Sequence, residues 1–145
     1  MRALTVRQPW ASAIAHADKR TENRVWPTSY RGPVLIHSAR TIDRAANRHA
    51  PMSAIVRGLQ LDLGAVLAVA RLVDCHDGTD ERTPCTPWAM KGHHHLVLDD
   101  VTALPLPVPW QGRLQLWVPP AELVARVRLQ LDDETAARLL DGEGS

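Results

Sequence analysis

The segment ADKRTENRVW, Ala17–Trp26, places cations and a carboxylate in a stretch whose length and flanks are typical of a β-strand. With a period of two, side chains divide between two faces. One face carries Lys19, Thr21, Asn23 and Val25, and the other carries Arg20, Glu22, Arg24 and Trp26. Neither face is apolar enough for an ordinary core. The segment is therefore either retained for the chemistry of its polar groups or is a solvated edge strand.

The flanks of this segment predict regular structure on both sides. ALTV, Ala3–Val6, predicts a short strand, and Gln8–Ala17 predicts a helix because Pro9 stands near its first position and alanines follow. On the other side, Pro27–Pro33 predicts a loop. VLIHSA, Val34–Ala39, then predicts a strand buried on both faces, because both alternating sets are mostly apolar.

The rest of the chain continues in mixed order. Thr41–Gln60 predicts a helix interrupted at Pro51, with Thr41 as its cap. A long strand is expected over Gly64–Cys75, followed by a loop over His76–Pro87.

Two more strands and a helix are expected near the end of the chain. The strands are His93–Asp100, with a turn at its two aspartates, and Gly112–Pro119, and the proline-spaced ALPLPVPW, Ala103–Trp110, is expected to connect them. The helix is Ala121–Leu131. Such an order does not fit a doubly wound sheet. The predicted class is α+β (mixed), a small β-barrel of five to six strands with two to three helices packed outside. Residues 1–131 are expected to form a single domain, and residues 132–145 a helical turn and a flexible tail.

Composition limits the functions that the chain can have. The 145 residues carry 17 basic and 16 acidic side chains, so no global field attracts a polyanion, and any contact with nucleic acid must be local. Five Trp, one Tyr and no Phe indicate either stacking surfaces or a biased coding sequence.

Cysteine content and hydropathy bear on location. Cys75 and Cys85 make no disulfide framework, and no apolar leader precedes Leu4, so a cytoplasmic location is expected. The longest apolar run, Gly64–Val73, is interrupted by Arg71 and is shorter than the roughly 20 residues of a membrane span. No membrane partner is expected.

Two long stretches resemble the ASCH domain family. They are LTVRQPWASAIAHADKRTENRVWPTSYRGPVLIHSA, from Leu4, and PWAMKGHHHLVLDDVTALPLPVPWQGRLQLWVPP, which ends at Pro120. The family signature is GxKxxExR, and here Ala17, Lys19, Glu22 and Arg24 stand at its four positions. Three positions match and alanine replaces the glycine, which leaves open whether the turn before Lys19 needs a positive φ.

The resemblance implies a fold and a class of ligand rather than a reaction. ASCH domains have a PUA-like β-barrel, are similar to the PUA, YTH and EVE domains, and are regarded as RNA-binding. A few members are hydrolases, and some others are described as ribonucleases. The small amidohydrolases among them that deacetylate acetylated cytidine carry Thr where this chain has Glu22.

The charged motif suits a nucleotide ligand. Lys19 is a compact cation for a phosphate or an oxyanion, Arg24 offers a planar fork, and Glu22 can accept from an exocyclic amine or orient Lys19. If the protein is an enzyme, Lys19 and Glu22 are the candidate catalytic residues. The alternative is that Glu22 and Arg24 form a structural ion pair at the barrel rim.

Further candidates for ligand binding lie next to the motif. Arg7 and Gln8 precede the first helix, whose free N–H groups favour an anion or are simply capped. Trp10, Trp26 and Trp88 can supply stacking surfaces, and Trp26 and Trp88 are the ones expected at exposed faces. Trp110 and Trp117 are expected in the barrel.

The histidine run predicts no metal site. His93 and His95 share a strand face, whereas a zinc site needs at least three protein ligands. Cys75, His76 and Cys85 have a spacing that matches no standard zinc pattern. No metal and no cofactor are expected, and the histidines are interpreted as polar residues of the rim or core.

Three hypotheses about function remain. The first is a module that binds RNA or single-stranded nucleic acid, recognising one nucleobase, natural or modified, in a cleft beside the motif. The second is a hydrolase that acts on RNA or on an acylated nucleoside, and the third is a regulatory protein that binds a nucleoside-like small molecule. The choice between RNA and DNA and the oligomeric state stay open.

Overall fold

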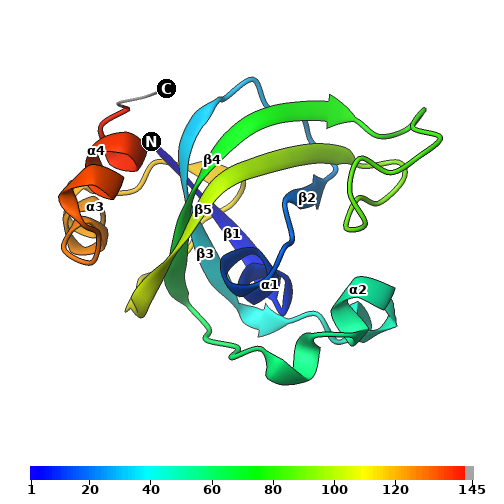
Figure 1. Cartoon of the computed structure of the whole chain (residues 1–145), viewed down its shortest axis with the longest axis horizontal. Coiled ribbons are helices and arrows are strands. Elements are labelled where there is room, and N and C mark those ends of the chain that lie inside the picture. The colour runs from blue at the N-terminus through cyan, green and yellow to red at the C-terminus, as the bar shows by residue number, and fades with distance from the viewer. Residues whose placement is uncertain (143–145) are drawn as a thin grey trace.

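Six strands form one curled sheet in the computed structural model, which describes residues 1–142 (Figure 1). The strands are β1 (Arg2–Gln8), β2 (Thr21–Arg24), β3 (Gly32–Ile42), β4 (Ala65–Asp77), β5 (His94–Pro109) and β6 (Leu116–Trp117). Their order across the sheet is β2-β5-β4-β3-β1-β6, in which β1 runs parallel to β3 and every other pairing is antiparallel. The sheet therefore makes a half-barrel with β2 and β6 at its edges.

The helices confirm the α+β class and correct two details of it. Within residues 1–142 they are α1 (Trp10–His16), α2 (Ala50–Ser53), α3 (Ala121–Arg128) and α4 (Asp133–Leu140), with the short 3-10 helices η1 (Arg44–Arg48) and η2 (Val56–Gly58). The described chain thus has four α-helices rather than two to three. In addition, α1 does not pack outside: it lies within the curve of the sheet and contacts β1, β3, β4 and β5 (Figure 1).

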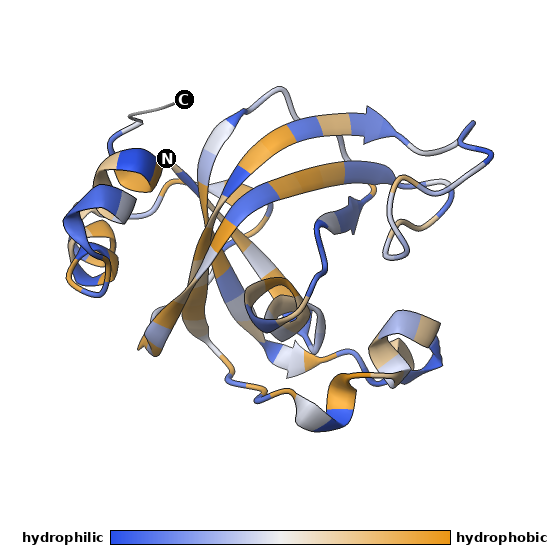
Figure 2. Ribbon diagram, viewed as in Figure 1, coloured by the Kyte–Doolittle hydropathy of each residue, from blue (hydrophilic) through white to orange (hydrophobic). Residues whose placement is uncertain are grey.

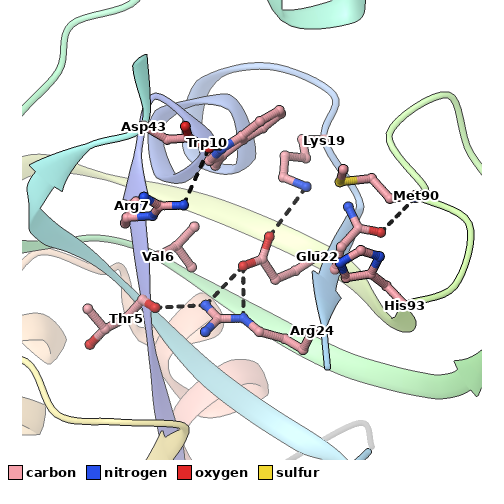
Figure 3. Close-up of a pocket in the computed structure, with 11 residues that line it drawn as sticks. Thr5, Val6, Arg7, Trp10, Lys19, Glu22, Arg24, Asp43, Met90 and His93 are labelled. Atoms are coloured by element: carbon pink, nitrogen blue, oxygen red, sulfur yellow. Dashed lines mark hydrogen bonds and ion pairs between the residues drawn. The ribbon is translucent and has the colours of Figure 1, made fainter. Parts of the chain in front are cut away.

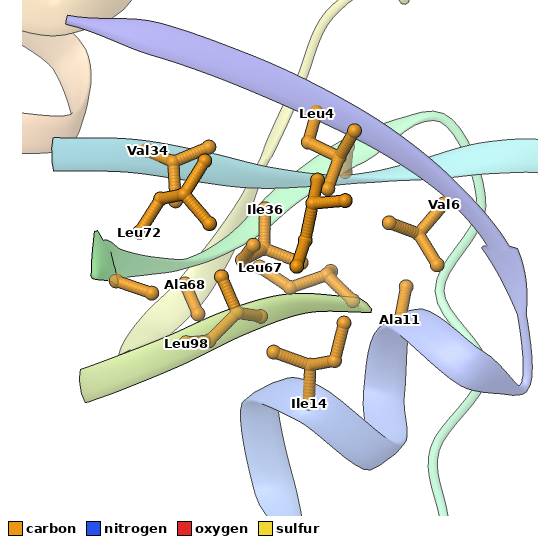
Figure 4. Packing of buried hydrophobic residues seen from close by; sticks show 13 residues of the cluster. Leu4, Val6, Ala11, Ile14, Val34, Ile36, Leu67, Ala68, Leu72 and Leu98 are labelled. Carbon is orange, nitrogen blue, oxygen red and sulfur yellow. The ribbon is translucent and has the colours of Figure 1, made fainter. Parts of the chain in front are cut away.

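Hydrophobic side chains cover both faces of the sheet, as the sequence predicted for Val34–Ala39. Val34 and Ile36 point to the concave face and pack with Ile14 of α1 (Figure 4). Leu35 points to the opposite face, where it packs with Leu123 of α3 and Leu139 of α4. Because strand side chains alternate, burial of both sets requires helices on both faces, and the fold supplies them.

The segment between β3 and β4 differs from the predicted helix. Thr41 is still part of β3, and the cap is Asp43, whose side chain accepts a hydrogen bond from the backbone N–H of Ala45 at 3.1 Å. Short helices η1, α2 and η2 follow in place of one long helix. Pro51 lies in the first turn of α2, where a missing N–H costs nothing, so it begins a helix rather than interrupting one.

A single long strand, β5, replaces two predicted elements. Its prolines were expected to lie in a connection, but Pro109 is the last residue of β5 and pairs with Ala65 at the end of the ladder. Pro105 and Pro107 fall in a stretch where the register with β4 shifts, so their missing N–H groups remove no regular ladder bond. Hydrophobic residues occupy much of β4 and β5 where they curve around the core, and the loop between them is mostly hydrophilic (Figure 2).

Two smaller expectations near the end of the chain also change. The predicted turn at Asp99 and Asp100 is an irregularity within β5, where Asp100 has a φ of 49° and its carboxylate pairs with Arg138. The predicted strand Gly112–Pro119 shrinks to the two residues of β6.

The C-terminal part has more structure than a helical turn. Helix α4 is eight residues long, and its Leu139 is fully buried beside α3. Residues 143–145, most of the predicted flexible tail, lie outside the described residues, and the division at residue 131 stays a prediction. Across residues 1–142, every helix is too short or too polar to span a bilayer.

Candidate functional site

A pocket of about 330 Å³ opens between β1, β2 and the loop that precedes β5. It contains the charged motif of the opening sequence segment (Figure 3). The residues that line it are Thr5, Val6, Arg7, Trp10, Lys19, Glu22, Asn23, Arg24, Asp43, Met90 and His93.

The centre of the pocket is a three-membered ion cluster around Glu22. One carboxylate oxygen of Glu22 lies 3.4 Å from Nζ of Lys19, and the other lies 2.9 Å from Nη2 and 3.0 Å from Nε of Arg24. Arg24 Nη2 also donates to the carbonyl oxygen of Thr5 at 2.7 Å, which ties β2 to β1. The cluster therefore is both a structural ion pair and the floor of the pocket, so the two interpretations of the motif are compatible.

Lys19 is the largest fully buried side chain of the described residues, with 1% of its surface exposed. Its Nζ donates to the carbonyl oxygen of Thr21 and lies 5.3 Å and 5.8 Å from the ring centroids of Trp10 and Trp88. Burial lowers the pKa of Lys19, and Glu22 opposes that shift by stabilising the ammonium form. The pocket floor thus holds a cation whose charge depends on its carboxylate partner.

Trp10 forms one wall of the pocket. Its indole N–H donates to Asp43 at 2.9 Å, and its ring makes edge contacts with His49 and Trp88. Arg7, whose side chain is 58% exposed, approaches the same Asp43 carboxylate at 3.5 Å (Figure 3). An indole face held by a hydrogen bond and an exposed surface cation therefore lie beside the ion cluster.

The structure brings together five of the eight predicted ligand-binding residues. Arg7, Trp10, Lys19, Glu22 and Arg24 all line the pocket.

Three predicted residues lie elsewhere. Gln8 is fully buried, and its side chain accepts from the N–H of Ser12 in the first turn of α1 at 2.9 Å instead of lining the pocket. Trp88 is 2% exposed and packs behind Lys19, contrary to the expectation of an exposed face. Trp26 is partly buried against the core and lines a different pocket, beside Tyr30.

The pocket also contains residues that the sequence interpretation missed. Asn23 was assigned to the face opposite Glu22, but its side-chain oxygen accepts from the N–H of Met90 at 2.8 Å and its amide donates to the carbonyl oxygen of Trp88 at 2.9 Å. These bonds fold the loop before β5 over β2. Met90 and His93 reach the pocket because this loop lies over β2, and no local sequence pattern indicates that. Asn23 could have been found, because it lies within the GxKxxExR-like motif.

The two aromatic residues expected in the barrel lie in or beside the buried cluster that contains Leu35, Leu123 and Leu139. Trp117 is 5% exposed, and Trp110 packs partly buried against the same cluster. Trp117 donates through its indole N–H to Oγ1 of Thr5 at 3.1 Å. Thr5 in turn contacts His37 at 3.2 Å, so polar contacts run from the pocket edge into the barrel.

A family model described as ASCH domain matches residues 4–124, most of the chain and all of the pocket. No curated protein matches the sequence.

Proposed function

The chain belongs to the ASCH domain family, whose PUA-like domains generally bind RNA, and from this premise we propose that the pocket around Glu22 binds a single nucleobase of an RNA strand. The observation that carries the proposal is the buried ion cluster at the pocket floor. Charges are costly to bury, and a polar floor of this kind supports recognition better than it supports stability.

Glu22 is the proposed reader of the base edge. Its two oxygens already accept from Lys19 and Arg24, and an ionised carboxylate has about four lone-pair sites, which leaves capacity for an exocyclic amine. The two cations hold the carboxylate in place. A natural or modified base with an amine on its edge therefore fits this floor best.

Trp10 and Arg7 supply the remaining contacts in this proposal. A base stacked on the Trp10 indole would gain about 1–3 kcal/mol, a contribution that is tolerant of base identity. Arg7 lies at the exposed rim beside Asp43, where a phosphate of the same nucleotide can reach its guanidinium. A net charge of +1 for the chain favours such a local contact over binding along a duplex.

The test uses short single-stranded RNA oligonucleotides and a panel of natural and modified nucleosides, with bound species identified by native mass spectrometry. Arg7→Ala is expected to weaken RNA binding. Arg57→Ala, which changes another exposed arginine that lies on η2 and does not line the pocket, serves as the matched control and is expected to leave binding unchanged. Equal loss in both variants would show that binding is diffuse and not centred on the pocket.

A second candidate function, hydrolysis of an acylated nucleoside or of RNA, rests on Lys19. Burial lowers the pKa of this amine next to a carboxylate, the kind of pairing that can serve acid–base chemistry. In that mechanism Glu22 activates water and Lys19 stabilises the oxyanion. We expect wild type to bind without converting its ligand. Release of acetate by wild type but not by Glu22→Gln, with binding retained, would establish the enzyme.

A further inference from the structure

Four potential metal ligands lie together where β4 ends and β5 begins, and none of them lines the pocket. They are His76 on β4, His95 on β5, and Glu81 and Cys85 on the loop that joins the two strands. One ligand atom from each lies within 4.8 Å of all the others. We propose that these four residues bind one Zn²⁺ ion, an inference that does not depend on the proposed function.

The spacing of the ligand atoms matches a tetrahedral zinc ion. With Zn–N of about 2.0–2.1 Å and Zn–S of about 2.3 Å, tetrahedral geometry places two nitrogen ligands about 3.3 Å apart and a nitrogen and a sulfur about 3.6 Å apart. Nδ1 of His95 lies 3.4 Å from Nε2 of His76 and 3.7 Å from Sγ of Cys85. The two distances from Nδ1 of His95 are thus already close to those of a tetrahedral zinc site.

Glu81 completes the set from the loop. Its Oε2 lies 3.1 Å from Nδ1 of His95, close to a tetrahedral edge, and its Oε1 lies 2.6 Å from Nε2 of His76. The second distance is shorter than a tetrahedral edge, so the carboxylate has to withdraw slightly when the ion enters. Glu81 lies on a loop, where such a movement costs little.

Each histidine has its outer ring nitrogen held by an acceptor. Nδ1 of His76 lies 2.8 Å from a carboxylate oxygen of Asp74, and Nε2 of His95 lies 2.7 Å from the carbonyl oxygen of Met90. A carbonyl and a carboxylate can only accept, so the outer nitrogens carry the protons and the inner nitrogens of the neutral rings present lone pairs. This is the arrangement that orients histidine ligands in zinc sites.

The carboxylate of Glu81 and the inner ring nitrogens of the two histidines need a positive charge between them. Oε2 of Glu81 is buried and has no hydrogen-bond partner among the described residues, although it lies beside Nδ1 of His95. A carboxylate oxygen and a nitrogen lone pair at that distance repel each other unless a proton or a cation lies between them. Zinc fits the mixed nitrogen, sulfur and oxygen donors better than calcium or magnesium, which prefer oxygen ligands alone.

The local backbone is built around His95. A Cβ on Gly78 would lie 2.3 Å from Cε1 of His95, so only glycine allows the loop to leave β4 this close to the ring. His76 and His95 are directly paired across β4 and β5. The sequence spacing showed none of this, because two ligands become neighbours only through strand pairing.

The site would stabilise the loop that closes the pocket. Between Cys85 and His95 the loop carries Met90 and His93, which line the pocket, and Thr86, whose hydroxyl lies 2.8 Å from that of Thr21 on β2. Cys85 and His95 stand at the two ends of this segment, and both are ligands in the proposed site. A bound zinc ion would therefore restrict the segment at both ends. Its role in this proposal is structural, with four protein ligands and no open position.

The test measures zinc and cobalt binding by the full chain without a histidine tag. We expect one zinc per chain by elemental analysis and native mass spectrometry, and a Co²⁺ form whose visible spectrum shows tetrahedral bands and a thiolate charge-transfer band. Cys85→Ala should lose the charge-transfer band and bind zinc more weakly. Cys85 is exposed, so this variant is expected to fold, which circular dichroism checks.

Cys75→Ala is the matched control, because Cys75 is the other free thiol and lies outside the cluster. It should bind both metals as wild type does. Asp74→Ala, which removes the acceptor behind His76, should weaken zinc binding on the order of 10–100-fold while keeping the charge-transfer band. If wild type binds no more zinc than Cys85→Ala, or if the Co²⁺ spectrum lacks the thiolate band, the four residues share protons and the proposal is wrong.

Discussion

The ammonium group of Lys19 lies 3.4 Å from a carboxylate oxygen of Glu22, and the two side chains expose only 1% and 9% of their surface. Arg24 contacts the other oxygen of the same carboxylate. One acidic residue thus compensates two cations at the bottom of a pocket. The consequences of this arrangement differ for stability and for binding, and variants can separate the two.

Glu22→Gln is expected to destabilise the protein, because it leaves Lys19 and Arg24 without a counter-charge. Breaking a buried pair costs about 3–5 kcal/mol, and the amide retains some hydrogen bonding, so we expect a value near the lower end. Urea unfolding measures it. Glu122→Gln, which removes an exposed pair with Arg126 on α3, should have little effect.

The cost of Glu22→Gln should fall as the pH rises. Burial already lowers the pKa of Lys19, and loss of the carboxylate that opposes this shift lowers it further. In the variant, the folded state then sheds the Lys19 proton at a lower pH than the unfolded state does, so the folded state gains stability as the pH rises through that range. A cost that stays constant between neutral and alkaline pH would contradict the role assigned to the ammonium group.

Trp10→Leu is expected to weaken binding of single-stranded RNA by about 1–3 kcal/mol, because leucine fills the space but offers no stacking face. Trp110→Leu is the control, since Trp110 packs against the cluster around Leu35 and does not line the pocket. Fluorescence titration of wild type and isothermal calorimetry of both variants measure the effect. Equal affinities of the two variants would remove stacking on Trp10 from the proposed mode of binding.

The salt dependence of RNA binding should be shallow. A pocket that takes one nucleotide neutralises one or two phosphates, and each contributes a slope of about −0.7 in log K against log salt for single strands. Arg7→Ala should reduce the magnitude of the slope by about that amount, whereas Arg57→Ala should not change it. A slope typical of many phosphates would indicate an extended basic surface instead.

His37 is expected to stay neutral in the folded protein. Burial lowers its pKa below the ordinary value of 6.5, the hydrogen bond to Trp110 opposes this shift, and Arg40 adds to it. Below about pH 6.5 the unfolded chain therefore binds more protons than the folded one, and this part of the stability is lost as the pH falls. Urea unfolding between pH 7.5 and about 5 should show the decline, and His37→Gln should reduce it. An imidazole that titrates at 6.5 or above in the folded state, followed by NMR, would contradict this expectation.

Much of the fold was predictable from local pattern. The alternation of apolar side chains in Val34–Ala39 indicated a strand buried on both faces, and Leu35 and Ile36 indeed pack against helices on opposite sides of the sheet. The wrong predictions of secondary structure also have local causes. Pro105 and Pro107 suggested a connection because a proline cannot donate to a ladder, but the register shift in β5 makes the missing donors harmless.

The residues of the candidate site were likewise predictable only in part. Lys19, Glu22 and Arg24 lie within six residues of one another, and their spacing by itself identified them as a polar cluster. The sequence did not indicate that Trp88 would be buried behind Lys19 while Trp10 faced the pocket, because the exposure of an indole depends on which segments pack over it. Nor did it indicate that Met90 and His93 would reach β2, since Asn23 holds their loop there through long-range hydrogen bonds.

The sequence by itself determined the class of the fold and the charged motif, because these depend on periodicity and spacing within single segments, and its resemblance over two long stretches indicated the family. Only the tertiary structure decided which residues share a pocket and that His76, Glu81, Cys85 and His95 converge. The physical reason is the pairing of β4 with β5: it sets His76 opposite His95 and folds the intervening loop back over both. Contacts of that kind depend on strand register, and no short stretch of the chain encodes register alone.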